Sequence, residues 1–289
     1  MKTKVLILGA DGMLGSACYK TLRLNPSINV IGTTRRNSPG LVRYEVGLDS
    51  LESLLTDEYD YVVNCIGVIK QRINPNNQES VSNTWAVNAK LPKEIASLCE
   101  LQSIKAIQIA TDCAFSGSRG NYTENDLLDA EDLYGLSKVS GEISSSHVLN
   151  LRCSIIGREI YGKHSLLEWF LAQEIGAKIQ GYTNHFWNGV TTLTFASILE
   201  GIIANDSFKS GTFHLVPADQ TSKFNLLSLF KEQFKRKDLE ITPTIDSKMV
   251  NRTLKTLYPS YNSELWNNSS CGRVLSIEES VALLAQTKD

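Results

Sequence analysis

The sequence predicts an α/β protein, a Rossmann-type doubly wound parallel sheet with a smaller C-terminal substrate lobe. Apolar strand-like runs alternate with helical stretches through the first half of the chain, which indicates parallel strands joined by right-handed crossovers. A glycine-rich turn also stands between the first apolar run and the first helical stretch. That position, at a strand-to-helix junction, is typical of dinucleotide-binding folds.

The expected elements follow from hydrophobic periodicity. Candidate strands are Lys4–Leu8, Asn29–Thr33, Tyr61–Ile66, Ala106–Ala110 and Asn150–Ile155, separated by helices at Leu14–Leu24, Leu48–Leu55, Ser80–Leu101 and Tyr134–Ser146. Beyond Gly157 we expect helices at Leu166–Ile175, Thr194–Ile203, Phe224–Lys235 and Ile277–Ala285, a strand at Gly211–Val216, and an irregular stretch from Pro243 to Asn268. These elements suggest a dinucleotide-binding domain over 1–160, completed by about 186–216, and a substrate-binding lobe over 161–185 and 217–289.

Composition narrows the class of protein. The chain has 289 residues, 42% hydrophobic and 21% charged, with a formal net charge of -2, so no basic footprint for nucleic acid is present. No apolar run approaches the roughly 18 residues of a membrane span, and the chain enters a strand at once, without a signal peptide. The six cysteines form no CxxC pair, so we expect reduced thiols, a cytoplasmic location and no metal site.

The turn after the first strand has the pattern G-x-x-G-x-x-G. Gly9 allows the tight turn, Gly12 leaves space for a pyrophosphate against the backbone, and Gly15 lets the helix pack closely. The N-terminus of the following helix offers free N–H groups and a positive dipole end to phosphates. The sequence therefore predicts a dinucleotide contact along this turn, made by Gly9, Asp11, Gly12, Met13, Leu14 and Gly15.

The end of the second strand indicates which dinucleotide is bound. NAD-binding proteins usually have an acidic residue there, whereas this chain has Thr34, Arg35 and Arg36, which suit the 2′-phosphate of NADPH. Asp49 is expected to approach the adenine, or else to cap a helix. Further along, the strand expected at Tyr61–Ile66 leads into the cleft at the carboxyl ends of the strands, where we expect Cys65, Ile66 and Gly67 to contact the coenzyme.

A catalytic set is predicted from Thr111, Tyr134 and Lys138. Tyr134 and Lys138 form Y-x-x-x-K, which puts both side chains on one helical face. The lysine charge is expected to lower the phenol pKa from about 10 toward neutrality, so that the tyrosine can act as a general acid. Thr111 stands at the end of the strand expected at Ala106–Ala110 and so points a hydroxyl into the cofactor cleft.

Together these motifs resemble the extended short-chain dehydrogenase/reductases, and within them the dTDP-4-dehydrorhamnose reductases. The resemblance covers nearly the whole chain. It includes the glycine turn, Val87-Asn88, Thr111-Asp112 running into Phe115-Ser116-Gly117, Tyr134-x-x-x-Lys138, Leu151-Arg152, Phe186–Thr192 and Gly211–Leu215. It implies that Thr111, Tyr134 and Lys138 are catalytic, with Lys138 also holding the nicotinamide ribose, and that Asp112 lies beside them.

The implied activity is NADPH-dependent reduction of the 4-keto group of a nucleotide-linked 4-keto-6-deoxy sugar, for surface-polysaccharide biosynthesis. Departures from the family pattern leave the sugar nucleotide open: Cys113 and Ala110 replace a usual tyrosine and serine, and Asn64-Cys65-Ile66-Gly67 replaces a usual Asn-Ala-Ala. We expect Asp112, Cys113 and Trp187 to contact the substrate, although a packed core position is the commoner fate of a tryptophan.

Two other functions compete with this one. An epimerase on the same scaffold would recycle a retained NAD, but the Thr34-Arg35 pair argues against it. A non-catalytic NADP-binding regulatory subunit would be expected to have degenerate Tyr/Lys positions, which are intact here. The expected partners are the nucleotide-sugar substrate and a second copy of the chain in a homodimer, with no nucleic acid and no membrane.

Overall fold

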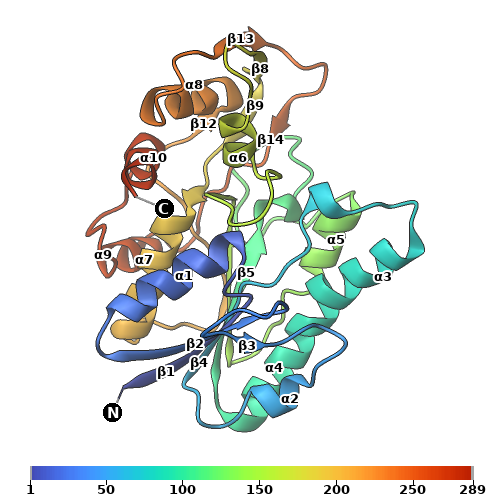
Figure 1. Cartoon of the computed structure of the whole chain (residues 1–289), viewed down its shortest axis with the longest axis vertical. Helices are drawn as coiled ribbons and strands as arrows, with labels where there is room; N and C mark the ends of the chain where they lie inside the picture. Colours follow the sequence, from blue (N-terminus) through green and yellow to red (C-terminus); the bar gives the residue numbers. More distant parts are fainter. Residues whose placement is uncertain (1, 288–289) are drawn as a thin grey trace.

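The computed structural model describes residues 2–287, and its centre is a seven-stranded parallel sheet (Figure 1). The strands are β1 (Thr3–Leu8), β2 (Ile28–Thr34), β3 (Val42–Arg43), β4 (Tyr61–Asn64), β5 (Lys105–Thr111), β6 (Val148–Cys153) and β11 (Gly211–His214). They lie in the order β11-β6-β5-β4-β1-β2-β3. The chain changes direction across the sheet between β1 and β4, and ligands of such sheets bind at the carboxyl ends beside this switch point. The predicted fold class is confirmed.

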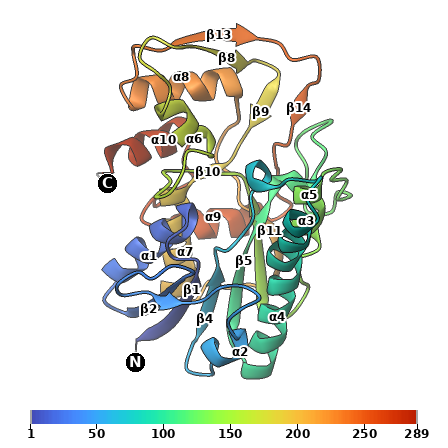
Figure 2. The same cartoon turned by 45° about the vertical axis from the view of Figure 1, so that its right-hand side comes forward.

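Helices cover both faces of the sheet (Figures 1 and 2). Val5 and Ile7 of β1 belong to a core with α1 (Met13–Leu24), α7 (Thr192–Ala204) and α9 (Pro259–Asn267). Leu6 and Leu8 belong to the opposite core, with α2 (Leu51–Leu54) and α4 (Leu91–Gln102). Successive strand residues point to opposite faces, so an uninterrupted apolar run is what a strand buried on both sides requires.

A smaller lobe stands beyond the carboxyl ends of the strands (Figure 2). Its core is formed by apolar side chains of helices α6, α8 and α10 and of short strands, among them Phe170, Phe230 and Ile277. Its elements are β7 (Ile155–Ile156), α6 (Leu166–Leu171), β8 (Lys178–Tyr182), β9 (His185–Trp187), β10 (Val190–Thr191), β12 (Thr221–Ser222), α8 (Lys223–Gln233), β13 (Glu240–Thr244), β14 (Val250–Asn251) and α10 (Ile277–Gln286).

The long helix expected at Ser80–Leu101 is present but contains a change of geometry. It consists of α3 (Gln78–Trp85), a π-helical turn η2 (Ala86–Lys90) and α4. π-Helical turns are rare in proteins, and those that do occur often lie at functional sites. Two short 3₁₀ turns, η1 (Lys70–Arg72) and η3 (Asp112–Ala114), follow β4 and β5.

Three expectations about elements were wrong. The helix expected at Tyr134–Ser146 is α5 (Leu133–Val139) and stops early, because the chain turns at Ser140 and Gly141. The helix expected at Leu48–Leu55 has only four residues. The stretch expected to be irregular contains β14 and α9, because Pro259 occupies the first turn of α9, where a missing N–H costs nothing.

Helix α9 also bears on the division into domains. Its Tyr261, Leu265 and Trp266 are buried in the core of the large sheet, although the helix lies within the range 217–289 expected to form the lobe. The boundaries of the two domains stay a prediction.

Candidate active site

The turn between β1 and α1 has the backbone shape that a phosphate needs. Gly9 has φ +78°, in the left-handed region that favours glycine. A Cβ on Gly15 would overlap the Gly9 carbonyl oxygen, so the third glycine allows the helix to approach its own preceding turn. Gly12 caps α1 without a side-chain hydrogen bond, and no acidic residue stands in the first turn. The helix N-terminus is therefore open to an anion.

Arginines rather than acids follow β2, as the sequence indicates. Thr34 is buried, and its hydroxyl accepts a hydrogen bond of 3.1 Å from the Arg36 N–H. Arg35 and Arg36 are exposed. The Arg36 guanidinium donates to the Asp11 carboxylate in the glycine turn at 2.6 Å.

Asp49 has a different local role from the helix cap considered for it. Ser50 is the cap residue of α2, because its hydroxyl accepts from the Ser53 N–H. The Asp49 carboxylate instead accepts the Glu45 N–H at 2.8 Å and pairs with Arg43 at 3.4 Å. The helix-cap interpretation was wrong, and an adenine contact stays a prediction.

The segment after β4 is held in place by two buried amides. β4 ends at Asn64, two residues earlier than expected, and the Asn64 amide oxygen accepts the Ile66 N–H at 3.1 Å. Asn88 of η2 bonds both the N–H and the carbonyl of Val68, at 2.9 and 3.0 Å. Asn88 also donates to the Ser137 hydroxyl at 3.1 Å. It therefore links the segment containing Cys65, Ile66 and Gly67 to α5.

Thr111, Tyr134 and Lys138 converge at the carboxyl end of β5. A Cβ on Gly135 would overlap the Cys113 carbonyl oxygen, so α5 packs directly on the turn that follows β5. In this position the Tyr134 phenol lies close enough to the Thr111 hydroxyl for that group to act on its pKa. The Lys138 ammonium, 8% exposed, donates to the Ile109 carbonyl of the same strand at 2.6 Å.

The electrostatics of this trio differ from expectation. Burial is the largest influence on Tyr134 and raises its pKa, and the charges of Cys113 and Asp112 add to the rise. The expectation that Lys138 lowers this pKa toward neutrality was wrong, because burial has the largest effect and the ammonium is directed to the Ile109 carbonyl. Burial lowers the pKa of Lys138 to about 8, against an opposing effect of Glu142.

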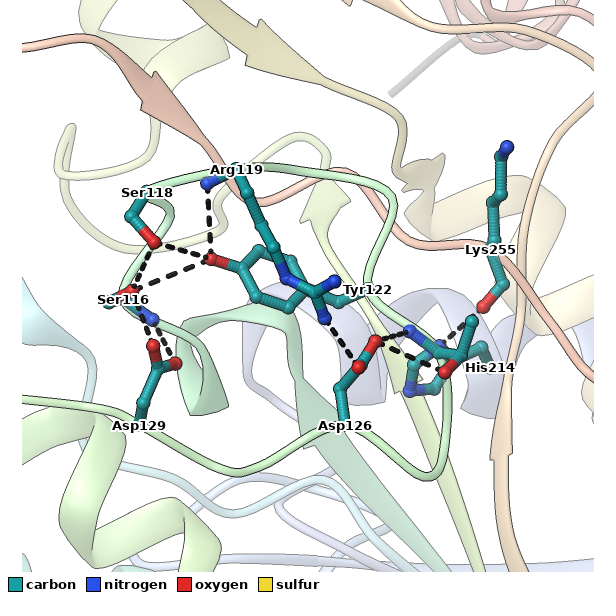
Figure 3. Close-up of polar contacts among 9 residues, drawn as sticks. Ser116, Ser118, Arg119, Tyr122, Asp126, Asp129, His214 and Lys255 are labelled. Atoms are coloured by element: carbon teal, nitrogen blue, oxygen red, sulfur yellow. Dashed lines mark hydrogen bonds and ion pairs between the residues drawn. The ribbon is translucent and has the colours of Figure 1, made fainter.

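The loop from β5 to α5 is fixed by its own polar contacts. Figure 3 shows the Tyr122 phenol oxygen facing Ser116, Ser118 and the Arg119 N–H, each at 3.4 Å. Ser116 donates to the Asp129 carboxylate through both its N–H and its hydroxyl, at 2.7 Å. The Tyr122 ring stacks on Phe115 with centroids 4.3 Å apart. These contacts define the path of the chain between Thr111 and Tyr134.

Comparison with known proteins shows the family to which the chain belongs. The model of the family described as "RmlD substrate binding domain" matches residues 3–165. The chain belongs to this family. The predicted membership of the extended short-chain dehydrogenase/reductases is thereby confirmed, as is the predicted enzyme class, an NAD(P)-dependent oxidoreductase of that type.

Individual relatives are distant. A probable low-salt glycan biosynthesis reductase from Haloferax volcanii is 32% identical over 143 residues, which span 47% of this chain and 46% of that protein. The beta subunit of methionine adenosyltransferase 2 from Bos taurus is 26% identical, over 86% of this chain and 77% of that one. A dTDP-4-dehydrorhamnose reductase from Aggregatibacter actinomycetemcomitans is 25% identical, over 84% of each chain.

Among solved structures, a dTDP-4-dehydrorhamnose reductase from Bacillus anthracis, in complex with NADP, matches with a TM-score of 0.77 and 17% identity. The match covers 98% of this chain and 99% of that one. At this identity, the likeness shows the fold.

Two cations of this RmlD-family protein were missed by the sequence analysis. The charges of Arg252 and Lys223 both act on Asp112, whose pKa is nevertheless raised because burial has the largest effect. Arg252 is held by a 2.8 Å hydrogen bond from its Nε to the Phe115 carbonyl. The Lys223 side chain forms no hydrogen bond or ion pair within residues 2–287, and burial lowers its pKa.

Lys223 and Arg252 follow the two short strands that flank β9 in the lobe. Ser222 of β12 and Asn251 of β14 both pair with Phe186, from opposite sides of β9. Lys223 and Arg252 are the next residues along the chain. No local motif marks either residue, so only the tertiary structure, in which both charges act on Asp112, could reveal them.

The three residues that the sequence predicts to contact the substrate, Asp112, Cys113 and Trp187, have contrasting surroundings. Asp112 accepts a 3.2 Å hydrogen bond from the Thr111 hydroxyl, and burial raises the pKa of Cys113 to about 12; both residues adjoin Thr111 in the chain. Trp187 is 7% exposed and packs in the core of the lobe, where its indole N–H donates to Ser154 at 2.8 Å. These surroundings are those of a packed core tryptophan.

Within the described residues, no group of three or more His, Cys, Asp or Glu side chains could hold a metal ion. The six cysteines are free. No helix among residues 2–287 has the length and apolar character needed to cross a membrane.

Proposed function

We propose that this protein is an NADPH-dependent reductase of the 4-keto group of a nucleotide-linked 4-keto-6-deoxy sugar, serving the biosynthesis of surface-polysaccharide sugars. The observation that carries the proposal is the convergence of Thr111, Tyr134 and Lys138 at the end of β5. The similarity to a dTDP-4-dehydrorhamnose reductase over 84% of the chain supports the same substrate class.

The residues at the β1–α1 turn fit a dinucleotide. The left-handed Gly9 and the uncapped start of α1 form a cradle for its pyrophosphate. The absence of an acid at the end of β2, together with the exposed Arg35 and Arg36, favours NADPH over NADH. The further coenzyme contacts that we propose are Asp11, Gly12, Met13, Leu14, Gly15, Thr34, Asp49, Cys65, Ile66, Gly67, Tyr134 and Lys138.

Tyr134, Thr111 and Lys138 each have a separate role in the proposed reaction. The coenzyme, when bound, supplies the hydride that reduces the ketone carbon. Tyr134 donates a proton from its phenol to the oxygen that was the ketone, and the Thr111 hydroxyl donates a hydrogen bond to the same oxygen. Lys138 holds the nicotinamide ribose and stabilises the tyrosinate left behind. Positioned proton transfer of this kind contributes roughly 10²–10⁴-fold to a rate.

The lobe supplies contacts to the remainder of the substrate. In a nucleotide-linked hexose the diphosphate is attached at C1, across the sugar ring from C4. Lys223 and Arg252 act on Asp112, the neighbour of Thr111, so they suit a diphosphate one ring away from the reacting carbonyl. Asp112 and Cys113 would contact the sugar itself.

The proposal is tested with a panel of nucleotide-linked 4-keto sugars, made in situ by a dehydratase and assayed by loss of NADPH absorbance. We expect oxidation of NADPH with at least one 4-keto-6-deoxy sugar and none with the 4-hydroxy sugars. No oxidation with any member of the panel would contradict the proposal. A tightly retained NAD in the purified protein would instead indicate an epimerase.

A non-catalytic subunit is the second candidate, because the methionine adenosyltransferase beta subunit aligns with 86% of this chain. A protein of that kind would bind NADPH without turning over any sugar nucleotide. The same panel separates the two functions, provided that NADPH binding is measured in parallel by fluorescence.

A further inference from the structure

Three side chains from distant parts of the sequence meet beside the glycine turn. Asp11 belongs to the turn, Arg36 follows β2, and Tyr161 comes from the segment that leads to α6. Figures 1 and 2 both show the yellow-green chain before α6 descending toward the start of α1. The site that we propose for the adenosine half of the coenzyme therefore has a neighbour from the lobe.

Contacts on two sides orient the Arg36 guanidinium. One of its N–H groups donates to the Asp11 carboxylate at 2.6 Å. One face lies over the Tyr161 ring, with Cζ 4.0 Å from the ring centroid. The Arg36 side chain is still 41% exposed, so other donors of its planar fork are available to an anion. Its neighbour Arg35 is exposed and has no hydrogen bond or ion pair within residues 2–287.

The segment that carries Tyr161 is tied to the lobe at its base. The Glu159 carboxylate accepts N–H groups of His164, at 3.0 Å, and of Ser165. Glu168 of α6 accepts the Arg158 Nε–H at 2.5 Å. Tyr161 is thus presented by a closed loop that α6 anchors.

We propose that Tyr161 is a positioning residue that holds the Arg36 guanidinium for the 2′-phosphate of NADPH, and that Asp11 is an internal counter-ion which this phosphate displaces. The Asp11 side chain, 14% exposed, accepts a single hydrogen bond from Arg36, whereas a phosphate dianion binds a guanidinium through stronger, bidentate bonds. Asp11 would therefore yield Arg36 to the 2′-phosphate and retain it when NADH, which lacks that group, is bound. The inference rests only on the coenzyme part of the proposed function.

The test titrates the whole protein with NADPH and with NADH, without any sugar, and follows nicotinamide fluorescence. For Arg36→Gln we expect NADPH to bind about ten- to a hundredfold more weakly, because charge-assisted hydrogen bonds are lost. For Tyr161→Leu we expect a loss of about two- to fivefold for NADPH. NADH affinity should be unchanged in both variants. Asp11→Asn should bind NADPH more tightly than the parent protein does.

Matched variants separate positioning from mere folding. Tyr161→Phe keeps the ring and should behave as the parent, and Tyr161→Leu combined with Arg36→Gln should bind NADPH no more weakly than Arg36→Gln alone. Equal loss of NADPH and NADH in Tyr161→Leu would overturn the proposal, as would a loss in Arg35→Gln that exceeds the loss in Arg36→Gln. Because no sugar is present, a failure of sugar reduction leaves this result unaffected.

Discussion

At the scale of single residues, burial determines the protonation of Tyr134 and Lys138, the pair proposed to be catalytic. Tyr134 and Lys138 are both shifted toward their uncharged forms, since removal from water penalises a charge on either group. Tyr134 therefore keeps its proton at neutral pH and can release it only to an oxygen that is gaining negative charge. Lys138, with a pKa of about 8, is the member of the pair whose charge changes near working pH.

The phenol of Tyr134 is the proton source in the proposed reaction. We expect Tyr134→Phe to lower turnover by roughly 10²–10⁴-fold, because the phenylalanine ring fills the same space without the donor. NADPH binding, measured by fluorescence titration, should be retained. Turnover near that of the parent protein would rule out the proposed role of Tyr134.

Lys138 should give the pH profile an alkaline limb. The ammonium loses its proton as pH rises through about 8, so activity that needs the charge should fall above that pH. Because the pKa of Tyr134 is raised, ionisation of this phenol adds no second limb to the pH profile near neutral pH. Initial rates measured from pH 6 to 10 would show the limb, and it should be absent from the residual activity of Lys138→Arg, because arginine stays charged throughout this range. A flat profile in the parent protein would contradict the assignment.

At the scale of elements, close packing of backbones brings the site together. Gly135 lies against the Cys113 carbonyl and Gly141 against the Asn88 carbonyl, so α5 contacts both the turn after β5 and the π-helical turn η2. Asn88 completes the arrangement through its bond to Ser137. The distance from Thr111 to Tyr134 is therefore determined by how closely α5 can approach β5.

Gly135→Ala should disturb that approach. The added methyl group would overlap a backbone oxygen, and overpacking of this kind typically costs about 1–3 kcal/mol. We expect a lower free energy of unfolding in urea and a lower kcat, since Tyr134 moves away from Thr111. Leu136→Ala, on the exposed part of the same helix, is the matched control and should change both much less. Parent-like kcat in Gly135→Ala would show that the packing does not govern the site.

At the scale of the whole molecule, the lobe places positive charge opposite the catalytic end of the sheet. Arg252 and Lys223 act on Asp112 from outside the sheet domain, and Tyr161 contacts Arg36 from the same lobe. A nucleotide sugar and a coenzyme would thus each be bound by residues from both parts of the chain.

Lys223→Met tests the contact to the substrate. We expect KM for the nucleotide sugar to rise about tenfold or more, because a charge-assisted hydrogen bond to phosphate is lost, while kcat changes little. Lys231→Met, later on the same helix, is the control and should keep the parent KM. Titration with dTDP and UDP by calorimetry gives an independent readout: equal affinity in parent and Lys223→Met would contradict a phosphate contact.

The sequence alone predicted the fold class, which is confirmed, and singled out Thr111, Tyr134 and Lys138, because both inferences depend on local patterns. Alternation of apolar runs predicts the parallel sheet, the glycine spacing predicts the phosphate turn, and the four-residue spacing of Tyr134 and Lys138 predicts a shared helical face. The family was recognised from the same motifs. These patterns are readable because each lies within a few residues of sequence.

Tertiary structure decided everything that depends on distant neighbours. It directed Lys138 to a backbone carbonyl, raised the pKa of Tyr134 and placed Trp187 in the core of the lobe. It also brought the charges of Lys223 and Arg252 within range of Asp112, and the Tyr161 ring against Arg36. Burial and charge–charge distance are properties of residues that are far apart along the chain, so no local pattern records them.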